Sequence, residues 1–187
     1  MRRATILAAA TLLLWASVAA AQKVKPIETF TAFVAAMQQG KAGTVTITIE
    51  RWSTDEERQM LLATLKEKGQ AGLMAELTRL PRVGYIRMPN TLGKDLHYAR
   101  DITLPDGSRR VVVATDRYLQ IREVSNATRS KNYDFAFAEL LMPKDGKGEG
   151  KLAPANKIEI NKETGQIEVE NFGTQPPRLL SITSKKP

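Results

Sequence analysis

The sequence contains no cysteine and only one histidine, His97. Without cysteine, thiol catalysis and thiolate metal sites are excluded, and no disulfide can support the fold. Any acid–base or metal chemistry that uses an imidazole has to use His97. The sequence also lacks the G-x-S-x-G pattern of many serine hydrolases and the G-x-x-x-x-G-K-[ST] phosphate loop. These absences remove several enzyme classes, and no cofactor-binding motif takes their place.

Long hydrophobic runs are also missing, except at the N-terminus. Residues 1–21 combine a basic start with an apolar run rich in Leu and Ala, and Ala19 and Ala21 stand at the −3 and −1 positions of an A-x-A cleavage pattern. This pattern predicts a signal peptide over residues 1–21, and an uncleaved anchor is the alternative. We therefore expect an exported protein, periplasmic or extracellular, whose mature part is a single β-rich domain over residues 22–187.

Positive charge is in excess, with 28 Lys and Arg residues against 20 Asp and Glu residues, a formal net charge of +8 and a pI near 9.8. The charges are scattered rather than grouped in runs, so a merely soluble basic surface explains them. The alternative is contact with an anionic envelope surface or with an acidic protein partner. Nucleic acid is not an expected partner, because an exported protein does not meet it. No pattern in the sequence indicates the oligomeric state.

Strand patterns dominate the chain after residue 80, where apolar and polar residues alternate between short turns. The expected strands are 83–88, 95–104, 109–116, 118–124, 132–142, 148–153, 156–161, 166–171 and 178–183. Residues 44–49 alternate in the same way, and residues 28–37 fit either a helix or the first strand of a hairpin, of which we expect the strand. Consecutive strands with short turns predict an antiparallel meander, and this many strands predict a barrel or a strongly bent sheet.

Helical spacing is clearest in one segment between the first hairpin and the later strands. Ser53 and Glu56 have the spacing of a capping box, in which each side chain satisfies a free backbone N–H at the start of a helix. Gly69 and Pro81 are stop signals for two successive helices. We therefore expect an αα-hairpin over about residues 54–80 that packs on the sheet, and hence an α+β fold that is mostly β.

The stretch MPKDGKGEGKL, residues 142–152, carries three glycines among lysines and acids. A calcium loop of the EF-hand type needs acidic residues where Leu141 and Pro143 stand. A phosphate loop needs a helix after it, whereas a strand pattern follows here. The stretch is therefore interpreted as a hairpin connection whose tip is Asp145-Gly146. Its lysines can also serve as a basic contact point.

His97 lies in a predicted hairpin with acidic neighbours. A register in which Leu104 pairs with Arg109 places His97 opposite Asp116, with two more carboxylates on the same face. The candidate divalent-metal site therefore consists of one imidazole and three carboxylates: His97, Asp95, Asp101 and Asp116. The alternative is a solvated His–Asp pair, because the apolar residues of this hairpin lie on its other face.

Arginines interrupt several of the apolar rows. Burying an arginine without a partner is costly, so each must find an acid, water or a ligand. Inside a barrel, such arginines can hold the carboxylate or phosphate of an amphiphilic ligand. The candidate ligand-binding residues are three arginines and one tyrosine: Arg51, Arg87, Tyr98 and Arg100. The alternative is that the arginines lie near strand ends, where they reach water or pair with Glu.

Five blocks of the mature chain stand out together: TVTITIERWSTDEER, LPRVGYIR, YARDITLPDG, DGKGEGKL and IEVENFGTQPPRL. In combination they resemble a family of secreted bacterial proteins of unknown function, over most of the mature chain. The resemblance implies secretion and a single domain. It implies no catalytic motif and no ligand.

Three functions are compatible with these observations. The first is a non-catalytic binding module with an apolar or amphiphilic small molecule inside a barrel. The second is an envelope interaction protein with a solid core, whose basic surface or sheet edge binds a protein partner. The third is a hydrolase built on a pair of Asp or Glu side chains, which sequence spacing cannot reveal across strands. No cofactor is expected for any of them.

Overall fold

The computed structural model describes residues 24–36, 41–88, 91–119, 135–161, 167–171 and 176–187, so the predicted signal peptide lies outside the described residues. The elements, in chain order, are β1 (Glu28–Ala36), β2 (Lys41–Ile49), α1 (Asp55–Arg79), β3 (Gly84–Arg87), β4 (Lys94–Thr103), β5 (Arg109–Thr115), β6 (Phe135–Met142), β7 (Gly148–Ile160), β8 (Ile167–Asn171) and β9 (Arg178–Lys185). In this part of the chain, no helix has both the length and the apolar composition needed to cross a bilayer.

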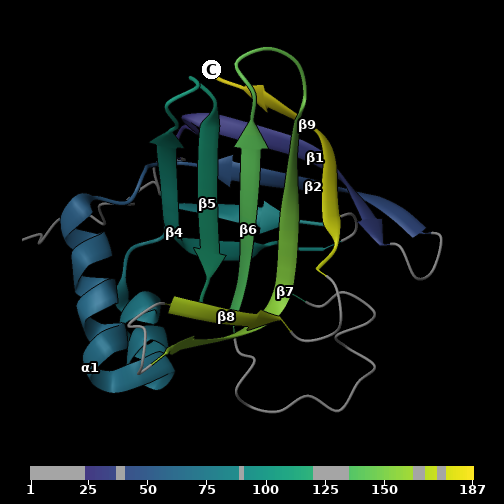
Figure 1. The fold of residues 1–187 in the computed structure, drawn as a ribbon. Helices are drawn as coiled ribbons and strands as arrows, with labels where there is room; N and C mark the ends of the chain where they lie inside the picture. Colours follow the sequence, from purple (N-terminus) through teal and green to yellow (C-terminus); the bar gives the residue numbers. More distant parts are fainter. Residues whose placement is uncertain (1–23, 37–40, 89–90, 120–134, 162–166, 172–175) are drawn as a thin grey trace, which may run out of the picture.

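The strands form a closed antiparallel barrel, as the alternating pattern predicted (Figure 1). Strands β1 to β6 pair in chain order, β6 pairs with β7, and β9 lies between β7 and β1 to complete the ring. In the described part of the chain, β8 pairs only with β7 and stands outside the ring. The fold is therefore mostly β, with α1 beside the barrel (Figure 1).

The register of the hairpins follows the alternation of the sequence. Residues 28–36 form the expected first strand, in which Phe30 pairs with Ile47 across β1 and β2. Ile158 pairs with Val169 across β7 and β8. The predicted strand over 118–124 is different, because Tyr118 and Leu119 belong to no strand and residues 120–124 lie outside the described residues.

Side chains from all the ring strands fill the interior of the barrel, and the core residues there are almost fully buried. The stretch 142–152 contains the hairpin connection between β6 and β7, in which Gly146 lies in the left-handed region at φ 94°. Its other two glycines belong to β7 and allow close packing. A Cβ on Gly150 would lie 2.3 Å from the Glu139 carbonyl oxygen, and one on Gly148 would lie 2.6 Å from that of Leu141. These glycines allow β7 to run tightly between β6 and β9.

The helix α1 begins one residue later than expected. Thr54 is the N-cap, and it exchanges hydrogen bonds with Glu57 in a capping box. The predicted cap at Ser53 and Glu56 is therefore wrong. The reason lies in the tertiary structure, because the buried Ser53 hydroxyl accepts a hydrogen bond from the Ala99 N–H of β4 at 3.1 Å.

Two helical segments make up α1, and they meet at a kink. The kink is at Gly69, which has a φ of 63° that favours glycine, as the stop signal predicted. The expected αα-hairpin therefore corresponds to the two segments of this single element. The kink turns α1 so that its second segment approaches the far end of β7 (Figure 1).

Candidate ligand-binding groove

An apolar groove of about 310 Å³ lies between α1 and the outer face of the barrel. Its lining, which defines the apolar groove, comes from α1, β4, β5, β6, β7 and β8: Arg58, Leu61, Leu62, Leu65, Leu73, Met74, Leu77, Tyr98, Val112, Ala114, Phe135, Phe137, Ile158 and Val169. Twelve of these fourteen side chains are apolar, and Tyr98 and Arg58 supply the polar atoms. An apolar ligand or the tail of an amphiphile fits this composition.

The outer wall of the groove follows from the run Val111-Val112-Val113-Ala114 on β5. Alternate residues of a strand point to opposite faces. Val111 and Val113 are buried in the core, so Val112 and Ala114 face α1. A continuous apolar run indicates a strand that is covered on both faces. This run is the signal that could have located the groove from the sequence, and the interpretation of the sequence did not use it.

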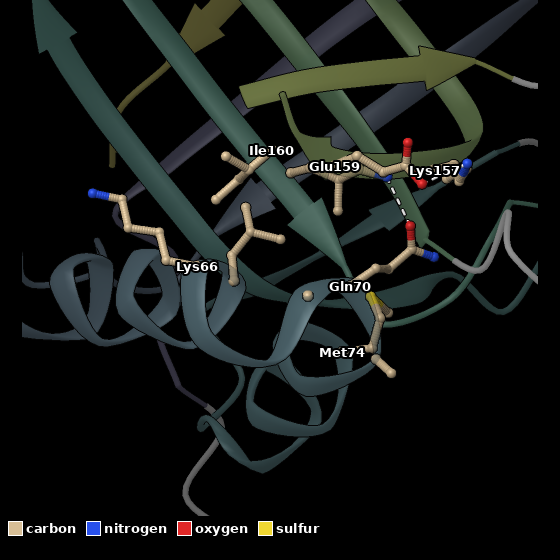
Figure 2. A pocket seen from close by; sticks show the side chains of 10 residues that line it. Lys66, Gln70, Met74, Lys157, Glu159 and Ile160 are labelled. Carbon is tan, nitrogen blue, oxygen red and sulfur yellow. Dashed lines mark hydrogen bonds and ion pairs between the residues drawn. The ribbon is translucent and has the colours of Figure 1, made fainter. Parts of the chain in front are cut away.

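A second pocket, of about 930 Å³, adjoins the apolar groove at the kink of α1. This kink pocket is lined by α1 and by the last residues of β7: Leu65, Lys66, Gly69, Gln70, Ala71, Met74, Lys157, Ile158, Glu159 and Ile160. Leu65, Met74 and Ile158 line both spaces, so the two are adjacent. Figure 2 shows Gln70 reaching from α1 to β7, where its Oε1 accepts a hydrogen bond from the Ile158 N–H at 2.7 Å.

Tyr98 and Arg58 are the polar groups at the rim of the apolar groove. Burial raises the pKa of the Tyr98 phenol, although Arg100 and Arg58 act in the opposite direction. The phenol is therefore neutral at ordinary pH and retains a proton to donate. The Arg58 guanidinium lies close enough to the phenol to lower its pKa, and no carboxylate of the described residues forms an ion pair with Arg58. A cation and an O–H donor thus stand together at the edge of an apolar space.

The predicted ligand-binding arginines do not point into the barrel. Arg51 donates to both carboxylate oxygens of Glu57, at 2.9 and 3.0 Å, and Arg100 lies 2.6 Å from Asp55. Both pairs attach the first turn of α1 to the barrel, as the alternative of arginine–acid pairing expected. Arg87 is exposed on β3. Of the four predicted residues, only Tyr98 lines the groove.

The predicted metal site is not assembled. His97 and Asp116 do come close, with Nε2 and Oδ1 3.8 Å apart. Asp101, however, accepts hydrogen bonds from Arg109, and Asp95 lies 3.6 Å from Arg82. Among the described residues, no three His, Asp or Glu side chains gather closely enough to hold a metal ion.

The predicted register of this hairpin is wrong both at the turn and at a β-bulge. Arg109 pairs with Thr103 instead of Leu104, and the register shifts again between Leu96 and Tyr98. His97 lies at the bulge and near Asp116, whereas Asp95 and Asp101 contact arginines instead. The Nδ1 atom of His97 lies 2.9 Å from the Leu80 carbonyl oxygen, which holds the imidazole against the end of α1.

A pair of carboxylates does come together at one end of the barrel, where Glu28 and Asp101 both bind Arg109. Burial by itself raises the pKa of Glu28, but hydrogen bonds from Arg109 and Ser184 outweigh it and hold the pKa below its ordinary value. A carboxylic acid that protonates a leaving group needs a raised pKa. Glu28 therefore lacks the raised pKa that a general acid requires.

Comparison with other proteins gives no function directly. No protein-family model, no curated protein and no solved structure matches the chain. The chemistry of the apolar groove and the kink pocket is therefore the basis on which a function can be inferred.

Proposed function

We propose that the mature domain is a non-catalytic, exported binding module that holds an apolar or amphiphilic small molecule in the apolar groove between α1 and the barrel. The observation that carries this proposal is an apolar space of about 310 Å³ with one cation and one phenol at its rim. Ligand pockets are mostly apolar with a few placed polar groups, and they begin at about 300 Å³. The A-x-A pattern at Ala19 and Ala21 supports export.

The site differs in position from the one that the sequence predicted. A ligand inside the barrel would have to displace core side chains such as Phe30, Ile47 and Leu140, each of which is at most 1% exposed. The groove outside the barrel needs no such displacement. Its wall belongs to the rigid barrel and its other side to a helix held at its first turn, which together form a preorganised site.

The rim indicates how an amphiphile is oriented. The apolar body lies along Leu62, Leu73 and Phe137, and the kink pocket receives the end of a longer ligand. An anionic head group then meets Arg58 and Tyr98. A guanidinium binds carboxylate or phosphate through two parallel hydrogen bonds, and the phenol adds a third donor.

The proposal is tested by filling the groove. Leu73→Trp places a larger ring in the groove, whereas Leu141→Trp makes the same change at an exposed apolar position on β6 away from the groove. With dodecanoate as the ligand in calorimetric titration, we expect Leu73→Trp to weaken binding by about tenfold or more, equivalent to about 1.4 kcal/mol. Leu141→Trp should bind like the parent protein. Equal affinity of both variants would show that dodecanoate does not occupy the groove.

The role of the rim is tested by a change of head group. Arg58→Gln removes the cation and keeps a polar side chain. We expect it to weaken dodecanoate binding about fivefold to tenfold while the neutral dodecanol binds as before, because only the anion uses the guanidinium. An equal loss for both ligands would assign Arg58 to packing instead of head-group recognition.

A further inference from the structure

The outer edge of β8 has backbone hydrogen-bonding groups that pair with no strand among the described residues. Ile158 donates its N–H to Gln70, so this N–H points away from β8. In an antiparallel pair, opposed residues alternate between those that exchange ladder hydrogen bonds and those that do not. Ile158 and Val169 are opposed and therefore form a non-bonded pair. The N–H and C=O of Val169 consequently point outward, away from β7.

The two edges of the β7–β8 ribbon differ in whether their backbone groups have a partner. At the edge of β7, the Gln70 side chain of α1 accepts the outward N–H of Ile158, as the backbone of a neighbouring strand would (Figure 2). At the edge of β8, no strand of the described part of the chain pairs with the outward groups, and β8 is the last strand in the sheet order. An open edge of this kind is a template for strand addition.

The two faces of the ribbon differ in chemistry. Val169 and Ile158 lie on the face toward the apolar groove, and Val169 is 45% exposed. The other face carries Lys157 and three glutamates: Glu159, Glu168 and Glu170. Lys157 forms an ion pair with Glu159 at 2.6 Å. By formal count, this face of the ribbon carries three carboxylates and one ammonium, whereas the whole protein has a net charge of +8. Glu168 accepts a hydrogen bond from the Asn161 side chain at 2.8 Å, and Glu170 also has a partner. A carboxylate has lone pairs for more than one donor, so both glutamates can accept a further hydrogen bond.

Charge also decides against a second copy of the chain as the occupant of this edge. If two β8 strands paired around a two-fold axis through Val169, Glu168 of one copy would lie opposite Glu170 of the other. Like charges directly opposite each other on a sheet are destabilising. A partner strand with lysine or arginine opposite Glu168 and Glu170 is stabilised by the same geometry, because opposite charges then face each other.

We propose that the outer edge of β8 binds an extended segment of a partner protein by strand addition, and that this segment alternates basic and apolar residues. Its backbone pairs with the outward N–H and C=O of Val169. Its basic side chains lie beside Glu168 and Glu170, and its apolar side chains extend the wall of the apolar groove next to Val169. This partner is additional to the small-molecule ligand, and it adjoins the apolar groove only at Val169.

The first experiment uses a short, end-capped peptide of alternating lysine and valine, followed by NMR of the full domain. We expect saturation to slow hydrogen exchange at the Val169 amide by about tenfold or more, because the added strand accepts its hydrogen bond. The same peptide with glutamate in place of lysine should not bind. N-methylation of alternate peptide amides should abolish binding if strand pairing carries it. Unchanged exchange at Val169, or equal binding of the N-methylated peptide, would overturn the proposal.

The second experiment reverses the charge of the edge. In the double variant Glu168→Lys/Glu170→Lys, we expect the preference to switch, so that the glutamate peptide binds and the lysine peptide binds about tenfold more weakly or not at all. The control, Glu67→Lys/Glu149→Lys, makes the same charge change at two exposed acids elsewhere and should keep the parent preference. A switch in both variants would reduce the effect to net charge and contradict the proposed site.

Dodecanoate titration of the same double variant separates the two proposals. The apolar groove keeps all of its lining residues when Glu168 and Glu170 are changed. If the double variant loses lysine-peptide binding but still binds dodecanoate, the lost binding is located at β8 and the groove is intact. If dodecanoate does not bind even the parent protein, the small-molecule proposal fails and the strand-addition proposal is not affected.

Discussion

Arg109 donates from its two terminal nitrogens to the two carboxylate oxygens of Glu28, at 2.9 Å each. The two residues belong to β5 and β1, which lie four strands apart in the ring. Glu28 is 2% exposed, and Asp101 and the Ser184 hydroxyl complete the cluster. This ion pair joins opposite sides of the barrel at one end, where the backbone ladder cannot do so.

Removal of the guanidinium from this cluster should be strongly destabilising. Arg109→Met leaves the buried Glu28 carboxylate without its main partner, and losing one partner of a buried ion pair costs about 3–5 kcal/mol. Arg110→Met is the matched control, because Arg110 is more exposed and lies 3.7 Å from Glu139. We expect the control to lose at most about 1 kcal/mol in urea unfolding. Similar losses for both variants would contradict a structural role for the cluster.

The same cluster predicts how stability depends on pH. The pKa of Glu28 lies below its ordinary value of 4.5 in the folded state. The stabilisation from the Glu28 carboxylate is therefore complete above that ordinary value, and it is lost as the pH falls through the lowered pKa. In urea unfolding between neutral and acidic pH, we expect the difference between the parent protein and Glu28→Gln to shrink in acid.

A second variant tests the direction of this shift. Ser184→Ala removes one of the hydrogen bonds that lower the pKa of Glu28. The acid loss of stability that depends on Glu28 should therefore be smaller, and complete at a higher pH, than in the parent protein. A loss of stability that is complete at a lower pH in Ser184→Ala than in the parent protein would contradict the lowered pKa of Glu28. A difference in stability between the parent protein and Glu28→Gln that does not change with pH would also contradict it.

The position of the helix cap can be tested at two adjacent residues. Thr54→Ala should lower the free energy of unfolding by about 1 kcal/mol, and Thr54→Ser should restore most of it, because both hydroxyls can accept the Glu57 N–H. Hydrogen exchange should accelerate at Glu57 in the alanine variant. Ser53→Ala should instead accelerate exchange at Ala99, whose N–H bonds Ser53. The reverse pattern would restore Ser53 as the cap.

The close packing of β7 predicts opposite results for two glycines. Gly150→Ala brings a Cβ to 2.3 Å from a backbone oxygen and 3.2 Å from Ile182, so a strand must move. We expect a loss of about 3 kcal/mol or more in thermal or urea unfolding. At Gly43 of β2, an added Cβ meets nothing within 4 Å. Gly43→Ala should therefore range from neutral to a gain of about 1 kcal/mol.

Much of the secondary structure could be predicted because its causes are local. The alternation around Ile47 and Ile158 has the period of a strand, and it indicated the faces of two hairpins. Gly69 and Gly146 marked the kink of α1 and the β6–β7 turn, since both have a positive φ that glycine adopts without strain. The absence of cysteine excluded thiol chemistry outright, because no fold can supply a side chain that the sequence lacks.

The candidate site was less accessible to sequence reasoning. Tyr98 was selected for its place in an apolar row, but the groove that it lines is formed by an outer barrel face and a helix. Arg51 and Arg100 were selected for the same reason, yet acids in the first turn of α1 satisfy them. Which acid meets which arginine depends on how the helix lies on the sheet, and residue spacing does not contain that information.

By itself, the sequence determined where strands, turns and helical segments occur, because those choices depend on neighbours along the chain. Tertiary structure alone decided the closure of the ring by β9, the bulge beside His97 and the choice of Thr54 over Ser53 as the helix cap. Each of these results from contacts between residues far apart in the chain. Their energies become available only when the barrel has closed, so no local pattern could specify them.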